Sequence, residues 1–235
     1  MNIKIIEPSF EIKTPLRWIK EYPKLIEEFG KTCYKSDISS SPNKFIKRII
    51  KNKHLSVIEH LSITVKIVCS RSCSQQIVRH RLGSFSQESQ RYVNYKKRGY
   101  EIICPENIKD PQEVQHKRFS EKLKRVGTIQ GAADCFYTDF VKDWKNSIEQ
   151  SIKKYENLLI EGFKPEDARS VLPNAMATTI ITTFNLREWR HVFEVRALNI
   201  NAQKEIRFIM RAISKRFAEL LPDFFEDQLN NIENK

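Results

Sequence analysis

Long apolar runs are missing from this sequence. No segment approaches the ~20 apolar residues that a membrane-spanning helix needs. The first residues, MNIKIIEPSFEIKTPLRW, carry Glu7 and Glu11 and lack the uninterrupted apolar core of a signal peptide. Repeats, low-complexity tracts and Gly/Ser linkers are missing too. We therefore expect a cytoplasmic protein with one domain over residues 1–235 and no membrane partner.

Disulfides and metal sites also find little support. The cysteines are odd in number and lack the spacing of a disulfide framework, which suits a reducing compartment. A zinc site made of Cys69, Cys73, His54 and His60 is conceivable, but three residues separate the two cysteines, instead of the two of a zinc knuckle. HLSVIEH (54–60) is not the H-E-x-x-H of a zinc hydrolase. We expect ordinary thiols and no metal. The cysteines are Cys33, Cys69, Cys73, Cys104 and Cys135.

The chain is basic, and its composition supports a folded core. It has 41 Lys and Arg against 29 Asp and Glu, a formal charge of +12, with 40% hydrophobic and 10% aromatic residues. The charge favours anionic partners: nucleic acid, an acidic membrane surface, or phosphorylated small molecules. Much of the excess is lysine, which is frequent throughout the chain and typical of a solvated surface. The positions of the arginines are therefore more informative than the total.

Hydrophobic periodicity predicts long helices and few strands, so the expected class is α+β with a small, mostly antiparallel sheet. Strands are predicted over 61–69, 100–105 and 177–185, where β-branched residues alternate or cluster. Helical spacing marks the remaining segments. Two predicted helices begin at Pro23 and Pro42, and an antiparallel helical hairpin covers 110–162. Further helices are predicted over 72–82, 166–172, 186–198 and 201–221, and Pro222 ends the last of them.

The segment RHRLGSFSQESQRY (79–92) concentrates positive charge among hydroxyl and amide side chains. It begins with the run Arg-His-Arg, and Arg91 follows ten residues later. If 72–82 is helical, Gln76 lies one turn from Arg79, and a loop after the helix adds serines and amides. Guanidinium groups bind phosphate in a bidentate manner, and hydroxyls complete the oxygen shell. The segment indicates a phosphate or nucleotide site, a nucleic-acid contact helix, or a solvated basic face.

A second basic cluster is NLREWRHVFEVRAL (185–198). Asn185 followed by a glutamate three residues on is a variant of the capping box. On a helix, Arg187 and His191 share a face, whereas Arg196 lies nine residues from Arg187 and falls on roughly the opposite face. Arg196 also stands among apolar residues, where an arginine usually has a partner. One helix could therefore present basic groups to two ligands.

These motifs resemble the flavin-dependent thymidylate synthase family. The family's signature, R-H-R-x-x-S-x-x-x-x-S-x-R, is filled at every fixed position between Arg79 and Arg91. Three further segments resemble family elements and stand in the family's order: HLSVIEH, DARSVLP and NLREWRHVFEVRA. The likeness extends from residue 54 to about residue 210 and so covers most of the chain.

The resemblance implies an enzyme that methylates dUMP to dTMP. The carbon would come from 5,10-methylenetetrahydrofolate, and reduced FAD, regenerated by NADPH, would supply the hydride. Family members use no cysteine nucleophile on the pyrimidine. Their sites lie between the subunits of a homotetramer, so the resemblance implies a homotetramer here, and small-molecule partners in place of nucleic acid.

The resemblance also implies which residues form the sites. Arg196 would act catalytically, because a fixed cation beside N3 of the uracil stabilises its ionised form. The dUMP-binding residues would be Gln76, Arg79, Gln87, Glu88, Ser89, Arg91, Arg169 and Arg196. The FAD-binding residues would be Ser56, Arg79, His80, Arg81, Gln87, Asn185, Arg187 and His191.

The chain departs from the family pattern at several positions. Many members have Asn-Glu where this sequence has Ser86-Gln87, Gly where it has Gln90, and some have Asn where it has His191. The Gln87 departure leaves open a relative that binds flavin and nucleotide without turnover. The alternative from another class is a basic nucleic-acid-binding protein that uses the 72–82 helix. Neither a recognised nucleic-acid motif nor an aromatic stacking platform supports that alternative.

Overall fold

The computed structural model describes residues 2–32, 42–109 and 131–233. These residues divide into two compact units, each made of several segments of the chain. Unit 1 comprises Met1–Glu7, Ser70–Ser72 and Glu88–Thr178, and unit 2 comprises Pro8–Cys69, Cys73–Gln87 and Thr179–Lys235. The expected class, α+β, is confirmed. Whether the two units act as one domain stays a prediction, and the first arm of the helical hairpin lies outside the described residues.

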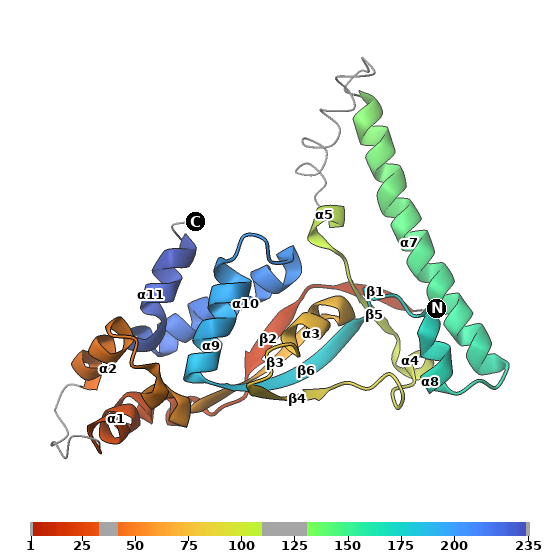
Figure 1. Cartoon of the computed structure of the whole chain (residues 1–235). Helices are drawn as coiled ribbons and strands as arrows, with labels where there is room; N and C mark the ends of the chain where they lie inside the picture. The colour runs from red at the N-terminus through yellow and green to blue at the C-terminus, as the bar shows by residue number, and fades with distance from the viewer. Residues whose placement is uncertain (1, 33–41, 110–130, 234–235) are drawn as a thin grey trace. The chain divides into compact units, whose positions relative to one another are not determined.

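Unit 2 is built on a four-stranded sheet in the order β2-β3-β6-β4 (Figure 1). The strands are β2 (Ser9–Ile12), β3 (Ser62–Ser70), β4 (Gly83–Gln87) and β6 (Ala177–Asn185). β2 pairs with β3 and β4 pairs with β6, both antiparallel, with Ser9 opposite Val68 and Gly83 opposite Phe184. The alternating burial of β3 follows from its alternating sequence. The predicted small, mostly antiparallel sheet is confirmed in this unit.

The helices of unit 2 pack their apolar faces against each other and against the sheet. α10 contacts β2, α9 and α11, and α2 contacts both α1 and α11. The helical elements are α1 (Leu16–Thr32), α2 (Pro42–Lys51), η1 (Leu55–His60), α3 (Arg71–Ile77), α9 (Leu186–Phe193), η3 (Glu194–Leu198), α10 (Lys204–Leu220) and α11 (Pro222–Glu233).

Two sequence predictions about these helices are wrong. Pro23 lies inside α1 and does not open it, because the first backbone hydrogen bonds run from Trp18 and Ile19 to the carbonyl of Pro15. Pro222 ends one helix but also begins α11, where its missing N–H costs nothing. Three strands, β1, β2 and β4, are also absent from the prediction.

An aromatic cluster fixes α9 on the sheet. Trp189 is fully buried, and its ring centroid lies 4.9 Å from Phe184 of β6 and 5.1 Å from Phe217 of α10. Its indole N–H donates a 2.9 Å hydrogen bond to the carbonyl of Ile63 on β3. Fully burying side chains of this size contributes ~1.5–3 kcal/mol each. The start of α9 is therefore held rigidly beside the ends of β3 and β6.

Unit 1 has a parallel strand pair and a long helix. β1 (Ile3–Ile6) pairs with β5 (Tyr100–Ile103), and α7 (Gly131–Ile160) is followed by α8 (Pro165–Ala168) and η2 (Arg169–Val171). The short helices α4 (Tyr95–Arg98) and α5 (Glu106–Lys109) flank β5. Its core contains Tyr95, Tyr100, Ile102, Ile148, Ile152 and Tyr155.

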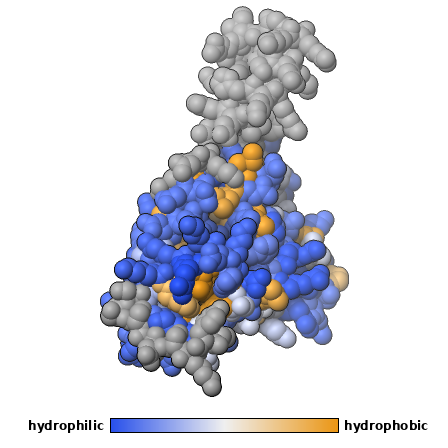
Figure 2. Space-filling model, turned by 60° about the vertical axis from the view of Figure 1, so that its left-hand side comes forward, coloured by the Kyte–Doolittle hydropathy of each residue, from blue (hydrophilic) through white to orange (hydrophobic). Residues whose placement is uncertain are grey.

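The visible face in Figure 2 is mainly hydrophilic, with apolar residues in small patches. Among the helices of the described ranges, none combines the length and the apolar composition that crossing a bilayer requires.

Candidate functional site

A cavity of about 1520 Å³ in unit 2 collects the residues that the sequence singled out for the flavin. Its lining comes from α2, the loop after α3, the start of α9, and α11. Six of the eight residues that the resemblance assigned to FAD line this cavity. The cavity-lining members are Arg79, His80, Arg81, Asn185, Arg187 and His191.

The Arg-His-Arg run reaches the cavity from a loop. α3 ends at Ile77, and the backbone N–H of His80 donates to the carbonyl of Ile77 at 3.1 Å. β4 starts at Gly83, where an added Cβ would lie 2.2 Å from the ring of Phe184. The predicted helix over 72–82 is therefore wrong beyond Ile77, because the chain must turn at once to pair β4 with β6.

Arg79 and Arg81 stand out from the other arginines of the cavity. Both are exposed, and within the described ranges neither side chain makes a hydrogen bond or an ion pair. By contrast, Arg187 pairs with Glu59, and Arg190 makes a two-bond pair with Asp227. Guanidinium groups without a protein carboxylate can take both oxygens of a phosphate. The loop is thus suited to an anionic ligand.

α9 begins with the cap that its sequence predicts. The side-chain oxygen of Asn185 accepts from the backbone N–H of Glu188 at 2.8 Å, and the N–H of Leu186 donates to the carbonyl of Leu61 at 2.9 Å. The other half of a capping box is not made, because the carboxylate of Glu188 faces His80 instead. The cap therefore leaves an acidic side chain inside a basic site.

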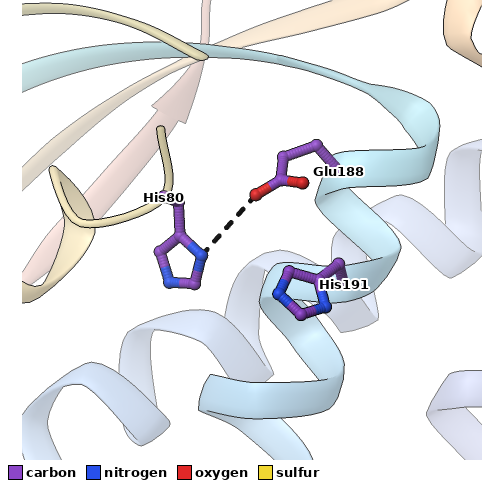
Figure 3. A group of neighbouring side chains, drawn as sticks. All are labelled: His80, Glu188 and His191. Carbon is purple, nitrogen blue, oxygen red and sulfur yellow. Dashed lines mark ion pairs between the residues drawn. The ribbon is translucent and has the colours of Figure 1, made fainter. Parts of the chain in front are cut away.

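His80, Glu188 and His191 form a compact cluster at the edge of the cavity (Figure 3). Nδ1 of His80 lies 3.6 Å from a carboxylate oxygen of Glu188, and the two side chains are only 7% and 8% exposed. Burial, with added repulsion from Arg196 and His191, lowers the pKa of His80 to about 4. Burial also raises the pKa of Glu188. His80 is therefore a neutral imidazole near pH 7.

The same cluster has the spacing of a metal site, but its charge argues for hydrogen bonding. Among the side chains described, these three are the one group whose ligand atoms all lie within 4.8 Å of one another. The guanidinium Nε of Arg196, however, donates to His80 Nε2 at 3.1 Å. A fixed positive charge against the imidazole repels a second cation. The cluster is better read as part of the anion site.

Arg196 lies in a π-helical turn, η3 (Glu194–Leu198), which follows α9 directly. The argument that placed Arg187 and Arg196 on opposite faces assumed a regular α-helix, so its angle does not apply here. The two arginines nevertheless have different neighbours: Arg187 lines the cavity and pairs with Glu59, whereas Arg196 bonds to His80. π-turns often mark functional sites.

Two glutamines predicted to contact the nucleotide also belong to unit 2. The amide of Gln76 hydrogen-bonds to the side chain of Gln203, and the amide N–H of Gln87 donates to the hydroxyl of Ser74 at 2.8 Å. Gln87 ends β4, so this part of the expected loop is a strand. The Ser-Phe-Ser alternation of the strand was visible in the sequence and was missed.

Unit 1 brings together the remaining predicted dUMP residues through a glutamate that the sequence did not single out. The guanidinium Nε of Arg91 donates to the carboxylate of Glu166 at 3.0 Å, and that of Arg169 donates to the carbonyl of Glu166 at 3.1 Å. The Ser89 hydroxyl accepts from the N–H of Arg91 at 3.3 Å. Both arginines thus contact Glu166 of α8, Arg91 at its carboxylate and Arg169 at its backbone carbonyl. A phosphate could take the place of the carboxylate beside Arg91.

Glu88 is held by its own partners in unit 1. Its carboxylate accepts a 2.7 Å hydrogen bond from the hydroxyl of Tyr95, and its carbonyl accepts one from Arg71 at 3.1 Å. Burial, together with the bond to Glu88, raises the pKa of Tyr95 well above its usual value. Arg71 and Tyr95 are therefore supporting residues that were not predicted.

Ser56, predicted to bind FAD, and the cysteines of the zinc alternative lie away from the cavity lining. Ser56 is exposed on η1 and does not line the cavity, whereas its neighbours Leu55 and Glu59 do. Cys69 and Cys73 are buried free thiols, and the pKa of Cys73 is raised by its hydrogen bond to Cys69 and by burial. Neither cysteine belongs to a group of metal-ligand spacing within the described residues.

The fold and the cavity define an α+β protein that presents arginines to an anionic ligand, and comparison with known proteins gives the family. The model of a family described as thymidylate synthase complementing protein matches residues 16–223. A flavin-dependent thymidylate synthase of Mycobacteroides abscessus is 32% identical over 212 residues, which are 87% of this chain and 79% of that one. One from Pyrococcus furiosus is 34% identical over 201 residues, 83% of this chain and 71% of that one.

A solved structure with the same fold agrees. The UMP/dUMP methylase PolB from Streptomyces cacaoi, bound with 5-Br UMP, superposes with a TM-score of 0.70 and covers 95% of both chains. At 20% identity this likeness concerns the fold alone. The matched family and the sequence relatives show that the chain belongs to the flavin-dependent thymidylate synthase family. The resemblance inferred from the sequence is confirmed.

Proposed function

We propose that this protein converts dUMP to dTMP, with 5,10-methylenetetrahydrofolate as carbon donor and NADPH as the source of reducing equivalents. Membership of the flavin-dependent thymidylate synthase family supports the reaction, and the relatives described above carry that name. When bound, FAD would relay the hydride from NADPH to the pyrimidine. The protein's own task is to bind, orient and polarise the substrates.

The observation that carries the proposal is the cavity with two unpaired guanidinium groups. Arg79 and Arg81 face it from the loop after α3, and Arg187 and His191 face it from α9. A flavin dinucleotide has a diphosphate that two guanidinium groups can hold, and a ring system that an imidazole ring can contact. The donor set of the cavity therefore fits FAD.

The cavity residues would divide the cofactor between them. The guanidinium groups of the loop would hold the diphosphate, and the α9 residues would contact the remainder. The full proposed FAD set is Ser56, Arg79, His80, Arg81, Gln87, Asn185, Arg187 and His191.

The proposed dUMP set is carried over from the family resemblance. Arg91 would exchange its contact with the Glu166 carboxylate for the nucleotide phosphate, which is also an anion. Arg169, which donates to the neutral carbonyl of Glu166, would bind the same phosphate. Arg196 would stabilise negative charge on the pyrimidine ring. The full set is Gln76, Arg79, Gln87, Glu88, Ser89, Arg91, Arg169 and Arg196.

We include in the proposal a homotetramer in the cytoplasm, with each site completed by neighbouring subunits. The departures at Gln87 and His191 bear on affinity. Gln87 is engaged by Ser74 through its amide N–H, which a glutamate carboxylate could not donate. His191 lines the flavin cavity and adds a ring where an asparagine would add an amide.

FAD binding tests the proposal directly. The purified protein should show a flavin absorption spectrum, or bind added FAD with a saturable change in flavin fluorescence. Arg79→Ala together with Arg81→Ala should weaken FAD binding at least about tenfold, because each charge-assisted hydrogen bond contributes ~1.5–3 kcal/mol. Arg216→Ala is the matched control, since its exposed pair with Glu219 lies outside the cavity.

Two results would overturn the assignment of this cavity. A protein that binds no FAD, but binds DNA or RNA with an affinity that falls steeply with salt, would favour the nucleic-acid alternative. FAD binding unchanged in the double variant would place the flavin elsewhere. FAD and dUMP binding without dTMP would identify a relative that has lost turnover.

A further inference from the structure

His80 stands at the boundary between the cavity and Arg196. The imidazole lines the cavity, and its Nε2 accepts the Nε–H of Arg196 at 3.1 Å. The two terminal nitrogens of Arg196 donate to no described residue. Arg196 is thus anchored at one nitrogen, and the end of its fork is left available for a ligand.

The bond from Arg196 determines which nitrogen of His80 carries the proton. A neutral imidazole has one N–H and one lone pair. Since Nε2 accepts from Arg196, the proton must be on Nδ1, and Nδ1 lies 3.6 Å from the carboxylate of Glu188. The opposite tautomer would set an N–H against the N–H of Arg196 and a lone pair against the carboxylate. Both contacts would then be repulsive.

We propose that Glu188 and His80 are positioning residues for Arg196: the Glu188 carboxylate holds His80 in the Nδ1–H tautomer, and His80 Nε2 then orients the guanidinium. The proposal rests on the proposed function, because the role of Arg196 at the pyrimidine comes from that function. Glu188 and His80 act through Arg196, and they need not touch the pyrimidine themselves.

The packing around His80 leaves the imidazole little freedom to turn. Its ring centroid lies 6.3 Å from that of Phe184 and 6.0 Å from that of His191, and both rings are nearly perpendicular to it. Glu188 comes from the first turn of α9, whose dipole stabilises a negative charge, and its backbone is fixed by Asn185. A rigid carboxylate therefore faces a rigid ring (Figure 3).

A purely structural role for Glu188 explains these contacts less well. A buried carboxylate is costly unless a partner uses its charge. Within the described residues, Glu188 makes no salt bridge to a lysine or arginine, although several arginines line the cavity. Its carboxylate instead faces the one ring that bonds to Arg196. This arrangement matches carboxylate–histidine pairs that fix a tautomer at other sites.

Glu188→Gln tests the proposal while keeping the shape of the side chain. A glutamine amide can donate to Nδ1, so the opposite tautomer becomes accessible and Arg196 loses its acceptor. We expect kcat for dTMP formation at saturating dUMP to fall about 10- to 100-fold. FAD content per subunit should stay within about twofold of wild type. Glu219→Gln, which removes an exposed carboxylate of α10, should change neither value.

The tautomer itself can be measured in the flavin-loaded protein. The chain has 5 histidines, so ¹⁵N-histidine spectra resolve few rings, and the nitrogen shifts distinguish Nδ1–H from Nε2–H. Wild type should show His80 as the Nδ1–H form at pH 7, and Glu188→Gln should shift it towards Nε2–H. A wild-type His80 in the Nε2–H form, or no change in the variant, would overturn the proposal.

A second pair of variants keeps the test valid if Glu188→Gln folds poorly. The amide oxygen of His80→Gln can reach the position of Nε2 and accept from Arg196, whereas the shorter His80→Asn cannot. With FAD saturating, His80→Gln should retain at least about tenfold more turnover than His80→Asn, as expected for a supporting contact. Equal turnover would contradict the positioning role.

The outcomes separate this proposal from the function on which it rests. Wild type that makes no dTMP in the same assay would refute the proposed function. Active wild type with an equally active Glu188→Gln would leave the function intact and refute the positioning role. Loss of FAD together with turnover in Glu188→Gln would assign Glu188 to cofactor binding instead.

Discussion

Gly83→Ala should disturb the cavity without removing any of its side chains. A Cβ at position 83 would lie 2.2 and 2.3 Å from two ring atoms of Phe184, and 3.0 Å from the carbonyl oxygen of Thr183. Real Cβ atoms do not come this close, so either the ring or strand β4 must move. Phe184 is 1% exposed and packs against Trp189 at 4.9 Å and Phe85 at 5.6 Å. Because the ring has no free space, we expect β4 to shift.

The magnitude follows from overpacking of a closed core. Such substitutions cost ~1–3 kcal/mol, which should appear as a lower midpoint of urea unfolding. The shift of β4 would also move the adjoining loop, so FAD affinity should fall at least about tenfold through Arg79 and Arg81. Urea titration followed by circular dichroism and FAD titration followed by fluorescence measure the two effects.

Gly162→Ala is the matched control for this prediction. Gly162 has a positive φ of 91° but no atom within 4 Å of an added Cβ. Its replacement should cost ~1–2 kcal/mol of backbone strain and leave FAD affinity unchanged. If Gly83→Ala bound FAD as tightly as Gly162→Ala does, the close approach of β4 to Phe184 would not be what positions the loop.

Three further predictions concern single side chains. Arg196→Ala should lower the rate of dTMP formation at least about 100-fold while FAD and dUMP still bind, because the guanidinium stabilises charge in the transition state. Retained synthesis would refute its role. His80, whose pKa is lowered to about 4, should make the protein less stable on acidification, because between pH 6.5 and 4 the unfolded chain holds a proton that the folded chain lacks. The free energy of unfolding should fall by up to ~1.4 kcal/mol per pH unit in this range. His80→Gln should flatten this slope. Tyr95→Phe removes the 2.7 Å bond to Glu88 and should lower the free energy of unfolding by ~1.5–3 kcal/mol in urea titrations, whereas an unchanged midpoint would show that the bond contributes nothing net.

Several elements could be predicted because a local signal specifies them. β6 has the predicted bounds, since nine consecutive residues rich in threonine and isoleucine favour a strand. The start of α9 was predicted because Asn185 caps the helix with its own side chain. The pattern of fixed residues between Arg79 and Arg91 identified the family, and it needed no tertiary information.

Other features depend on contacts that no local pattern records. The end of α3 at Ile77 is imposed by the pairing of β4 with β6, so the helix predicted over 72–82 extends too far. The π-helical turn that carries Arg196 has no sequence signature of its own. The placement of Glu188 beside His80 is likewise tertiary, since 108 positions separate the two residues along the chain.

The dTMP assay with omissions tests the central claim most directly. The purified protein should be incubated with FAD, NADPH, dUMP and methylenetetrahydrofolate, and the product separated by chromatography and identified by its mass. The account predicts dTMP in the complete mixture, and none when dUMP, the folate or NADPH is left out. A protein that binds FAD and dUMP yet forms no dTMP in the complete mixture would contradict it.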